Sequence, residues 1–390
     1  MVTTGVAPSG LFKSFFPLST NGVSTPSGVV PNTTDTGSAA LPKDSRFTQI
    51  SAHAVAGFSA YTDSYTTSTP NADPKKKPTT QTITDTVVRY ISRANGYVYE
   101  KRNDANPIQI SNIYIPNIYE GSFMDNNQTA LLRFLRDDGK TIATYAVPIP
   151  LKNPDGTRTQ KEGRFFNDGI NSLAVSPDQK EFLRIYPQKS STELLISSSS
   201  DTNKKELINT PFSEWLPLWP TTNTPYLQTK ASSSAEGFLY KIDRTERRLR
   251  RVLGNINGLT TIVSPSGTYI LYSQSTTNSF QTILFNTKTN KTTPLSLKII
   301  PEKCTWTLFE DLICAGNNVV ADGIYPDGWY AGVLHFNDRL VRITTQTNTY
   351  EVLYDGTERQ FDMTNLQYNA LSNHIYFIDK NTGILWQYQL

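Results

Sequence analysis

The stretch of residues 316–338 carries the side chains that are best suited to contact another molecule. It reads GNNVVADGIYPDGWYAGVLHFND and brings Tyr325, Asp327, Trp329 and Tyr330 together on a segment shaped by Gly and Pro. Aromatic rings stack on sugars, peptides or other rings, and a nearby carboxylate adds a hydrogen-bond acceptor. We therefore expect a site here for a protein or glycan partner. The alternative is that these rings pack between structural elements and plug one end of the fold.

Two other connections carry aromatic residues that we place with this loop. Tyr119 lies in IYIPNIYEG (113–121), and Trp215 ends TPFSEW (210–215). Both segments join predicted groups of strands on the same side of the molecule, as argued below. Tyr119 and Trp215 therefore complete the set of candidate binding residues, with the same alternative of packing between strands.

Catalytic patterns along the chain are weak. His53, His335 and His374 lie in three separate segments without the spacing of metal ligands. The segment 151–162, LKNPDGTRTQKE, resembles a calcium loop but has Leu151 where the leading carboxylate should be, so a turn is the better interpretation. There is no GxSxG elbow and no glycine-rich phosphate loop. We expect no cofactor and no metal, and a binding module rather than an enzyme.

Cys304 and Cys314 are the two cysteines, at the ends of the run CTWTLFEDLIC. If this run is a hairpin, the two residues face each other across its strands. A disulfide would then suit an oxidising compartment. The alternative is two reduced thiols that pack as small apolar side chains.

The elements that position these residues are short strands in groups of four. The chain contains 20 Tyr and 18 Phe, which favour strands, and 23 Pro and 22 Gly, which interrupt them throughout. The first group covers 53–61, 86–93, 97–102 and 108–112, and five further groups of four follow. Groups three to six begin about 43 residues apart, which is the size of one blade of a β-propeller.

The last group has only three strands, NLQYNAL, HIYFID and ILWQYQL, before the chain stops. The segment RFTQIS (46–51) reads like the outer strand of the other groups. We predict that it crosses back and completes the seventh blade beside ILWQYQL, which would close the ring and protect its edges. The fold class is therefore all-β, a seven-bladed propeller of four-stranded antiparallel blades over residues 46–390.

Two turns repeat almost the same phrase between the first and second strands of a blade. They are SPDQ in AVSPDQKEFLRIY (174–186) and SPSG in IVSPSGTYILYS (262–273). Pro presets the turn and Gly tolerates positive φ. This pattern resembles the TolB-like, WD40-like family of bacterial propeller repeats, whose hallmark is a Ser-Pro-Asp-Gly hairpin. The chain is also similar to uncharacterised anchored propeller proteins of candidate-phylum bacteria. The resemblance implies the fold but leaves the function open.

The propeller geometry assigns the connections to faces. Loops from strand four to the next strand one, and from strand two to strand three, lie on one side, called here the upper face. The loop 316–338 and the segments of Tyr119 and Trp215 belong to it. The polar insertion 62–85, with Lys75, Lys76 and Lys77, belongs to the opposite, lower face, where we expect a solvated loop.

Charge and composition limit the kinds of partner and the cellular location that we expect. A formal net charge of +3 over 390 residues gives no basis for a nucleic-acid or membrane partner. Residues 1–45 are rich in Ser, Thr, Gly, Pro and Asn, which is typical of a flexible tether. We expect an anchor upstream of this sequence, and a location outside the cytoplasm at a bacterial cell envelope or surface.

We therefore predict an extracytoplasmic binding or scaffold module that recognises a protein or glycan through the aromatic loops of its upper face. Two alternatives stay open. One is a lyase or hydrolase that acts on polysaccharide with carboxylates in the channel. The other is a structural subunit of a surface layer or appendage, with the oligomeric state left undetermined.

Overall fold

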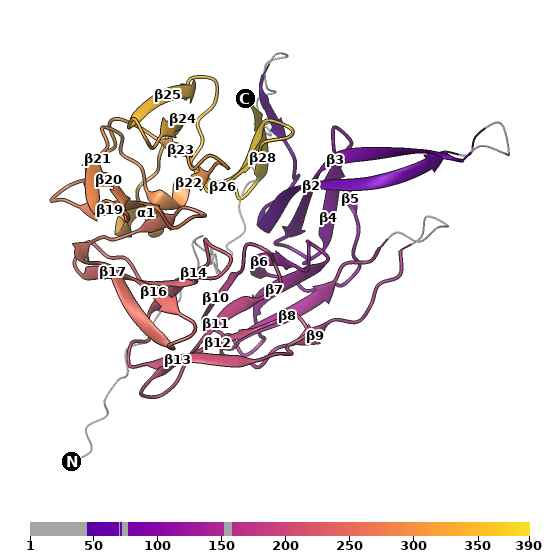
Figure 1. Ribbon diagram of the computed structural model, residues 1–390, viewed down its shortest axis with the longest axis horizontal. Coiled ribbons are helices and arrows are strands. Elements are labelled where there is room, and N and C mark those ends of the chain that lie inside the picture. The colour runs from indigo at the N-terminus through magenta and orange to yellow at the C-terminus, as the bar shows by residue number, and fades with distance from the viewer. Residues whose placement is uncertain (1–44, 70, 72–76, 152–157) are drawn as a thin grey trace, which may run out of the picture.

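Seven four-stranded antiparallel sheets account for nearly all regular structure in the computed structural model, which describes residues 45–69, 71, 77–151 and 158–390. The sheets follow one another around the molecule in chain order, as the colours of Figure 1 show. Six sheets consist of four consecutive strands, and the seventh has the order β1-β28-β27-β26. The predicted seven-bladed β-propeller is confirmed.

The strands of the first three blades are β2 (Val55–Thr69), β3 (Thr79–Ser92), β4 (Val98–Arg102) and β5 (Ile108–Gln109); β6 (Ile118–Met124), β7 (Thr129–Leu135), β8 (Ile142–Pro148) and β9 (Arg164–Phe165); and β10 (Ser172–Val175), β11 (Phe182–Pro187), β12 (Thr192–Ser197) and β13 (Lys205–Thr210). Those of the fourth and fifth are β14 (Trp215–Leu218), β15 (Tyr226–Thr229), β16 (Glu236–Asp243) and β17 (Arg248–Asn257); and β18 (Thr261–Val263), β19 (Tyr269–Ser275), β20 (Phe280–Asn286) and β21 (Lys291–Pro294). The last two blades contain β22 (Cys304–Trp306), β23 (Leu312–Gly316), β24 (Arg339–Thr344) and β25 (Thr349–Tyr354); and β26 (Met363–Asn369), β27 (His374–Asp379), β28 (Leu385–Gln389) and β1 (Phe47–Gln49). Two short helical turns, η1 (Pro301–Lys303) and α1 (Asp327–Tyr330), lie in connections of the upper face.

The two repeated turns have the same geometry. The fourth residue has positive φ in both, 59° at Gln179 and 73° at Gly267. In each turn the backbone N–H of this residue donates to the carbonyl of the leading serine, Ser176 or Ser264, over 2.8 Å. The serine hydroxyl accepts a further backbone N–H at the start of the next strand. The repeat therefore encodes one hairpin with local hydrogen bonds, whether Gly or another residue takes the strained position.

The apolar core lies between the faces of neighbouring blades. Each of the seven pairs of adjacent blades encloses its own cluster of buried side chains among the described residues. The pair formed by the last and the first blade is one of them, with Ile50, Phe58, Val88 and Tyr376 in its cluster. The ring is therefore closed by packing as well as by strand pairing.

The closure uses the predicted N-terminal strand. Strand β1 pairs antiparallel with β28, with Phe47 opposite Tyr388 and Gln49 opposite Trp386. The inner strands of blades seven and one are also joined, because the Gln367 side chain accepts from Ala60 N over 2.9 Å and donates to Phe58 O over 3.1 Å. The first and last parts of the chain therefore hold each other in place.

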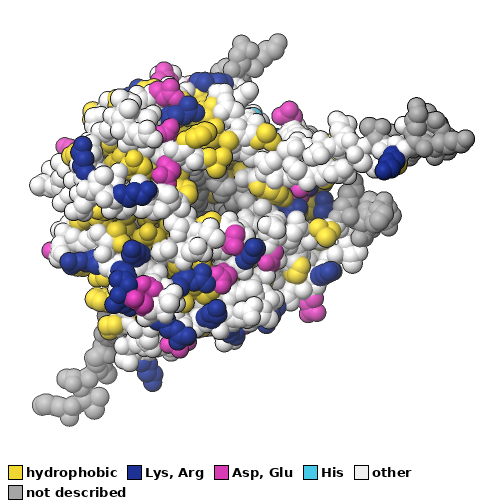
Figure 2. Space-filling model, in the orientation of Figure 1, with side chains coloured by type: hydrophobic (Ala, Val, Ile, Leu, Met, Phe, Trp, Pro, Cys, Tyr) yellow, Lys and Arg dark blue, Asp and Glu magenta, His cyan; other side chains and the backbone are white. Residues whose placement is uncertain are grey.

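One prediction for the lower face is wrong. The insertion 62–85 does not form a loop over its whole length, because β2 and β3 stay paired from Val55–Ser92 out to Thr69–Thr79. The alternation of Thr and Ser with larger side chains lets the two strands continue beyond the blade as a hairpin arm. Figure 1 shows this arm projecting at the right, and in Figure 2 its visible surface is mostly backbone and side chains that are neither hydrophobic nor charged. Lys75 and Lys76 lie outside the described residues.

Of the two alternatives for the cysteines, a disulfide or two reduced thiols, the structure contains the disulfide. Cys304 and Cys314 are directly opposite each other on β22 and β23, with Cα atoms 4.1 Å apart, and their sulfur atoms are bonded. The expected tether lies almost wholly outside the described residues, and the NPDG turn near Leu151 lies wholly outside them. In the part of the chain that the structure describes, no helix is long and apolar enough to cross a membrane.

Candidate functional site

The loop between β23 and β24 is the largest connection of the upper face, and it spans several blades. The backbone N–H of Ser233, in blade four, donates to Asp327 Oδ2 over 2.7 Å. Gly323 N donates to Asn278 O, in blade five, over 2.9 Å, and the Ser275 hydroxyl donates to Tyr325 O. The loop therefore acts as a cap that is anchored to neighbouring blades, with α1 at its centre (Figure 1).

The aromatic side chains of this cap face inward. Trp329 and Tyr325 are each 1% exposed and form a separate apolar cluster with Phe280, Ile300 and Phe336. The expectation that these two rings are exposed is wrong, because the blade tops below the loop leave an apolar space that large rings fill favourably. The two residues pack in the protein's own interior, as in the plug alternative.

Asp327 and Tyr330 are half-buried within the same loop. Burial raises the pKa of Asp327, but hydrogen bonds from Ser233 and Ser232 lower it, and the net result is a pKa below the ordinary value. The Tyr330 hydroxyl donates to Glu302 Oε1 over 2.5 Å. Both polar groups therefore fasten the cap to the upper face.

The two outlying candidates are not brought to this loop. Trp215 is 2% exposed and packs in the core between blades three and four. Tyr119 is half-buried, and the guanidinium of Arg133 lies 5.2 Å from the centre of its ring. The aromatic side chains that are exposed in these connections are instead Tyr114, at 63%, and Phe212, at 60%. The six predicted residues therefore do not form one contact surface.

A buried cluster of charges beneath the cap is absent from the predicted set. Lys303, Asp338 and Asp362 are each 0% exposed, and the Lys303 ammonium contacts both carboxylates. Lys303 comes from η1, Asp338 from the end of the loop and Asp362 from the connection into blade seven. Spacing along the sequence could not reveal the cluster, because three different connections supply its members. The unusual signal was a lysine two positions after the apolar run IIP.

Glu302 lies next to this cluster, and its raised pKa predicts that the stability of the protein depends on pH. Burial raises the pKa of Glu302 from 4.5 to about 7, against the lowering effects of Tyr330 and Lys303. Between these two values the unfolded chain binds fewer protons than the folded one, so stability falls as pH rises towards 7 and then levels off. The Glu302 contribution is at most about 3 kcal/mol.

We expect Glu302→Gln to flatten this part of the profile, as measured by urea unfolding at several pH values between about 4.5 and 8. Glu214→Gln, which changes a carboxylate that is 57% exposed on the same face, is the matched control and should leave the profile as in the wild type. A profile that is the same in all three proteins would contradict the assignment.

Three aliphatic side chains of the cap are well exposed, beside polar ones such as Asp322 and His335. Val319, Ile324 and Val333 are 82%, 59% and 75% exposed. Gly323, which precedes Ile324, packs against Leu334, which follows Val333, and leaves no space there for a side chain. In Figure 2, hydrophobic side chains are prominent over the half of the molecule that contains β19–β25. The cap therefore presents apolar atoms to solvent from a backbone that buried rings hold in place.

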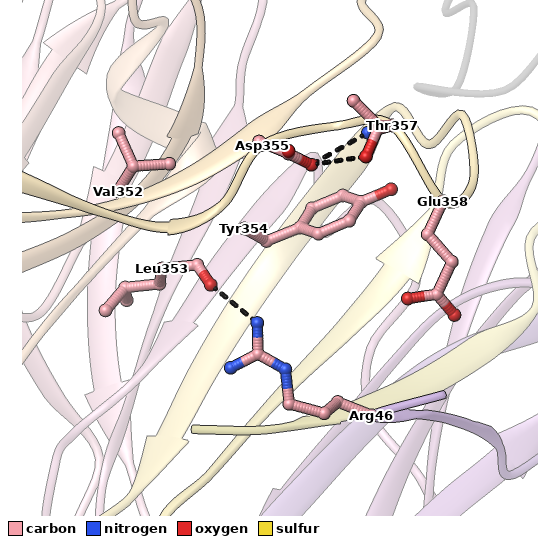
Figure 3. A pocket seen from close by; sticks show the side chains of 7 residues that line it. All are labelled: Arg46, Val352, Leu353, Tyr354, Asp355, Thr357 and Glu358. Carbon is pink, nitrogen blue, oxygen red and sulfur yellow. Dashed lines mark hydrogen bonds between the residues drawn. The ribbon is translucent and has the colours of Figure 1, made fainter. Parts of the chain in front are cut away.

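A cavity of about 310 Å³ lies at the closure seam rather than at the cap. Figure 3 shows its lining, in which Arg46 donates to Leu353 O and Asp355 accepts from Thr357. Arg46 also lies over the Tyr388 ring, 4.6 Å from its centre. Arg46 joins the N-terminal strand to β25 across the seam, whereas Asp355 and Thr357 pair within one turn. None of the predicted site residues lines the cavity.

Two of the three histidines are exposed, and one of these, His335, lies in the cap itself. His53 and His335 are exposed, and His374 Nδ1 lies 2.6 Å from Ser372 O within blade seven. Among the residues that the structure describes, no group of three or more His, Cys, Asp or Glu side chains is arranged to hold a metal ion.

Comparisons with known proteins find likeness in structure only. No family model and no curated protein matches the chain. An oligogalacturonate lyase in complex with manganese is similar, with a TM-score of 0.51, 10% identity and coverage of 86% of this chain and 98% of the lyase. The oligogalacturonate lyase of Vibrio parahaemolyticus also has a TM-score of 0.51 and 10% identity, with coverage of 78% and 86%.

TolB from Acinetobacter baumannii is also among the neighbours, with a TM-score of 0.41, 15% identity and coverage of 67% of this chain. The matched part of this chain spans 61% of the length of that TolB structure. Identities this low concern the fold and not the chemistry. The chain is a seven-bladed β-propeller of the architecture that its Ser-Pro hairpins indicate.

Proposed function

We propose that this chain is a non-enzymatic binding or scaffold module, outside the cytoplasm, that recognises a protein partner through the cap on its upper face. The observation that carries the proposal is that the cap contains two kinds of side chain, buried rings and exposed aliphatic groups. Its large rings are buried and hold the backbone, while Val319, Ile324 and Val333 are exposed. A surface that is already ordered loses little conformational entropy when a partner binds.

The chemistry of this surface favours a protein over a glycan. Sugar recognition by stacking requires exposed ring faces, and the rings of Tyr325 and Trp329 are buried. Exposed aliphatic side chains gain free energy when another apolar surface covers them. The glycan alternative then depends on Tyr114 and Phe212, which lie on other connections.

The location rests on the disulfide and on composition. A Cys304–Cys314 bond suits an oxidising compartment and is rare in the cytosol. The Ser- and Thr-rich N-terminal segment would separate the propeller from an envelope anchor, which we propose lies upstream.

Affinity capture from native cell envelope tests the proposal. The bait is the full chain, compared with the double variant Ile324→Asp, Val333→Asp. A charge in the centre of an apolar contact should weaken binding at least about tenfold, so a protein held by the wild type should be lost. The melting temperature should stay unchanged, because both side chains are exposed.

The matched control is Leu308→Asp, Phe309→Asp, in a turn of the lower face where the two side chains are 84% and 86% exposed. It should retain the partner. Loss of the partner from this control alone would place the contact on the lower face. Capture of a polysaccharide instead of a protein would favour the glycan alternative.

One observation favours the surface-layer alternative. The hairpin arm of β2 and β3 continues beyond its blade, and its outer part carries sheet edges that could pair with another chain. Assembly that depends on protein concentration, measured by light scattering, would favour this role. A polysaccharide lyase or hydrolase stays an alternative. This chain shares only its fold with the oligogalacturonate lyases named above.

A further inference from the structure

The fully buried lysine beneath the cap is placed for a reaction with one of its two carboxylates. Lys303 Nζ lies 2.8 Å from Asp338 Oδ2 and contacts Asp362 Oδ1 still more closely. All three side chains are 0% exposed. An amine and a carboxyl group that are held in contact in this way have a very high effective concentration, which removes most of the entropic cost of their reaction.

The surroundings shield this contact from bulk water. The Phe336 ring centre lies 4.6 Å from Lys303 Nζ, and the Trp329 ring centre lies 5.3 Å from it. Trp329 is 1% exposed and Phe336 is 6% exposed. Burial of an ion pair in such surroundings is costly, so its replacement by a neutral group would be favourable.

Asp362 has the hydrogen bonds expected of a carboxyl group that an amine attacks. Trp329 Nε1 donates to Asp362 Oδ1 over 3.2 Å and to Oδ2 over 3.1 Å. The backbone N–H of Phe336 donates to Oδ2 over 3.2 Å. Two fixed donors on one carboxyl group withdraw electrons from its carbon and stabilise negative charge on oxygen during attack.

Asp338 has the properties of a proton carrier. Its Oδ2 accepts the backbone N–H of Met363 over 2.6 Å, whereas its buried Oδ1 has no hydrogen-bond partner among the described residues. Burial raises the pKa of Asp338 above its usual range, and Asp362 adds to this effect while Lys303 opposes it. A carboxyl group in this state can take and return protons.

We propose that Lys303 and Asp362 are joined by an intramolecular amide bond that the folded protein forms itself. Asp338 removes a proton from the Lys303 ammonium, and the free amine attacks Asp362 Cγ. The C–N bond forms, one C–O bond breaks and the oxygen leaves as water. This water carries the two protons that the nitrogen loses, and Asp338 relays them. One positive and one negative charge disappear, and no oxidant, reductant or co-reactant is required.

The bond would tie together parts of the ring that are distant in sequence. Lys303 directly precedes blade six, and Asp362 directly precedes blade seven, 59 positions later. The next residue after Lys303 is Cys304, which the disulfide links to Cys314. Two covalent links would then secure the last blades beside the closure of the propeller.

The intact mass of the reduced wild-type chain tests the proposal without any variant. We expect the folded protein to weigh less than its sequence mass by one water molecule. Lys303→Met and Asp362→Ala should each have the full mass of their sequences. Lys380→Met, which changes another lysine that lies 5.2 Å from the Trp329 ring centre, is the control and should still lack one water. A wild-type chain of full mass would show a buried ion pair and overturn the proposal.

Tryptic digestion identifies the acceptor. An amide to Asp362 blocks cleavage after Lys303 and joins peptide 299–339 to peptide 360–380 in one branched product. An amide to Asp338 would instead lie within peptide 299–339, and this result would overturn the assignment of Asp362. Asp338→Asn should slow the loss of water at least about tenfold in chains that fold for the first time, as when they are refolded from inclusion bodies, since general acid–base catalysis contributes 10²–10⁴-fold in typical cases. An unchanged rate would overturn the relay.

Discussion

Phe47→Ala should lower the free energy of unfolding by about 3–5 kcal/mol, the usual cost of removing a buried phenylalanine ring. Phe47 is 3% exposed on β1. Its ring centre lies 4.6 Å from that of Tyr388, 4.8 Å from Tyr354 and 5.0 Å from Phe361. The substitution therefore leaves a cavity at the point where the N-terminal strand completes the last blade.

Denaturant unfolding followed by tryptophan fluorescence measures this effect. Thr48→Ala is the matched control, because Thr48 is the exposed neighbour on the same strand and should change stability little. Limited proteolysis should also become faster in the Phe47 variant, since a loosened β1 exposes both blade edges. If the two variants were equally stable, the N-terminal strand would not be a major support of the ring.

Trp329→Ala should destabilise the protein by a similar amount, about 3–5 kcal/mol. The indole fills the apolar cluster beneath the cap, and its N–H donates to both oxygens of Asp362. Without it, the cap loses its main anchor and a buried carboxylate loses a donor. The effect is measured as the shift in denaturation midpoint, and Val333→Ala, at an exposed position of the same loop, should be nearly neutral.

Trp329→Phe separates the two contributions of this residue. It keeps most of the ring volume but removes the N–H, so we expect a smaller loss, about 1–3 kcal/mol, for a buried acceptor left with fewer donors. A Trp329→Ala variant of wild-type stability would contradict the packing role and restore the case for a contact residue.

The position of the strands could be predicted from the sequence because each blade is a local pattern. Alternating apolar residues, and turns such as SPDQ and SPSG, determine hairpins within about a dozen residues. The missing strand of blade seven followed from counting, and the Phe47–Tyr388 pairing confirms it. The length of the β2–β3 arm was missed, since a Thr- and Ser-rich stretch is compatible with either a loop or a strand.

The sequence by itself determined the blade repeat and the closure by residues 46–51. It placed Cys304 and Cys314 in one hairpin but left open whether they are bonded. Only the tertiary structure decided which side of the cap its side chains face, because burial depends on whether neighbouring blades leave space for a ring. It alone also assembled Lys303, Asp338 and Asp362, which three separate connections bring together. Local patterns define strands and turns, whereas a site made from connections depends on how the blades are placed around the ring.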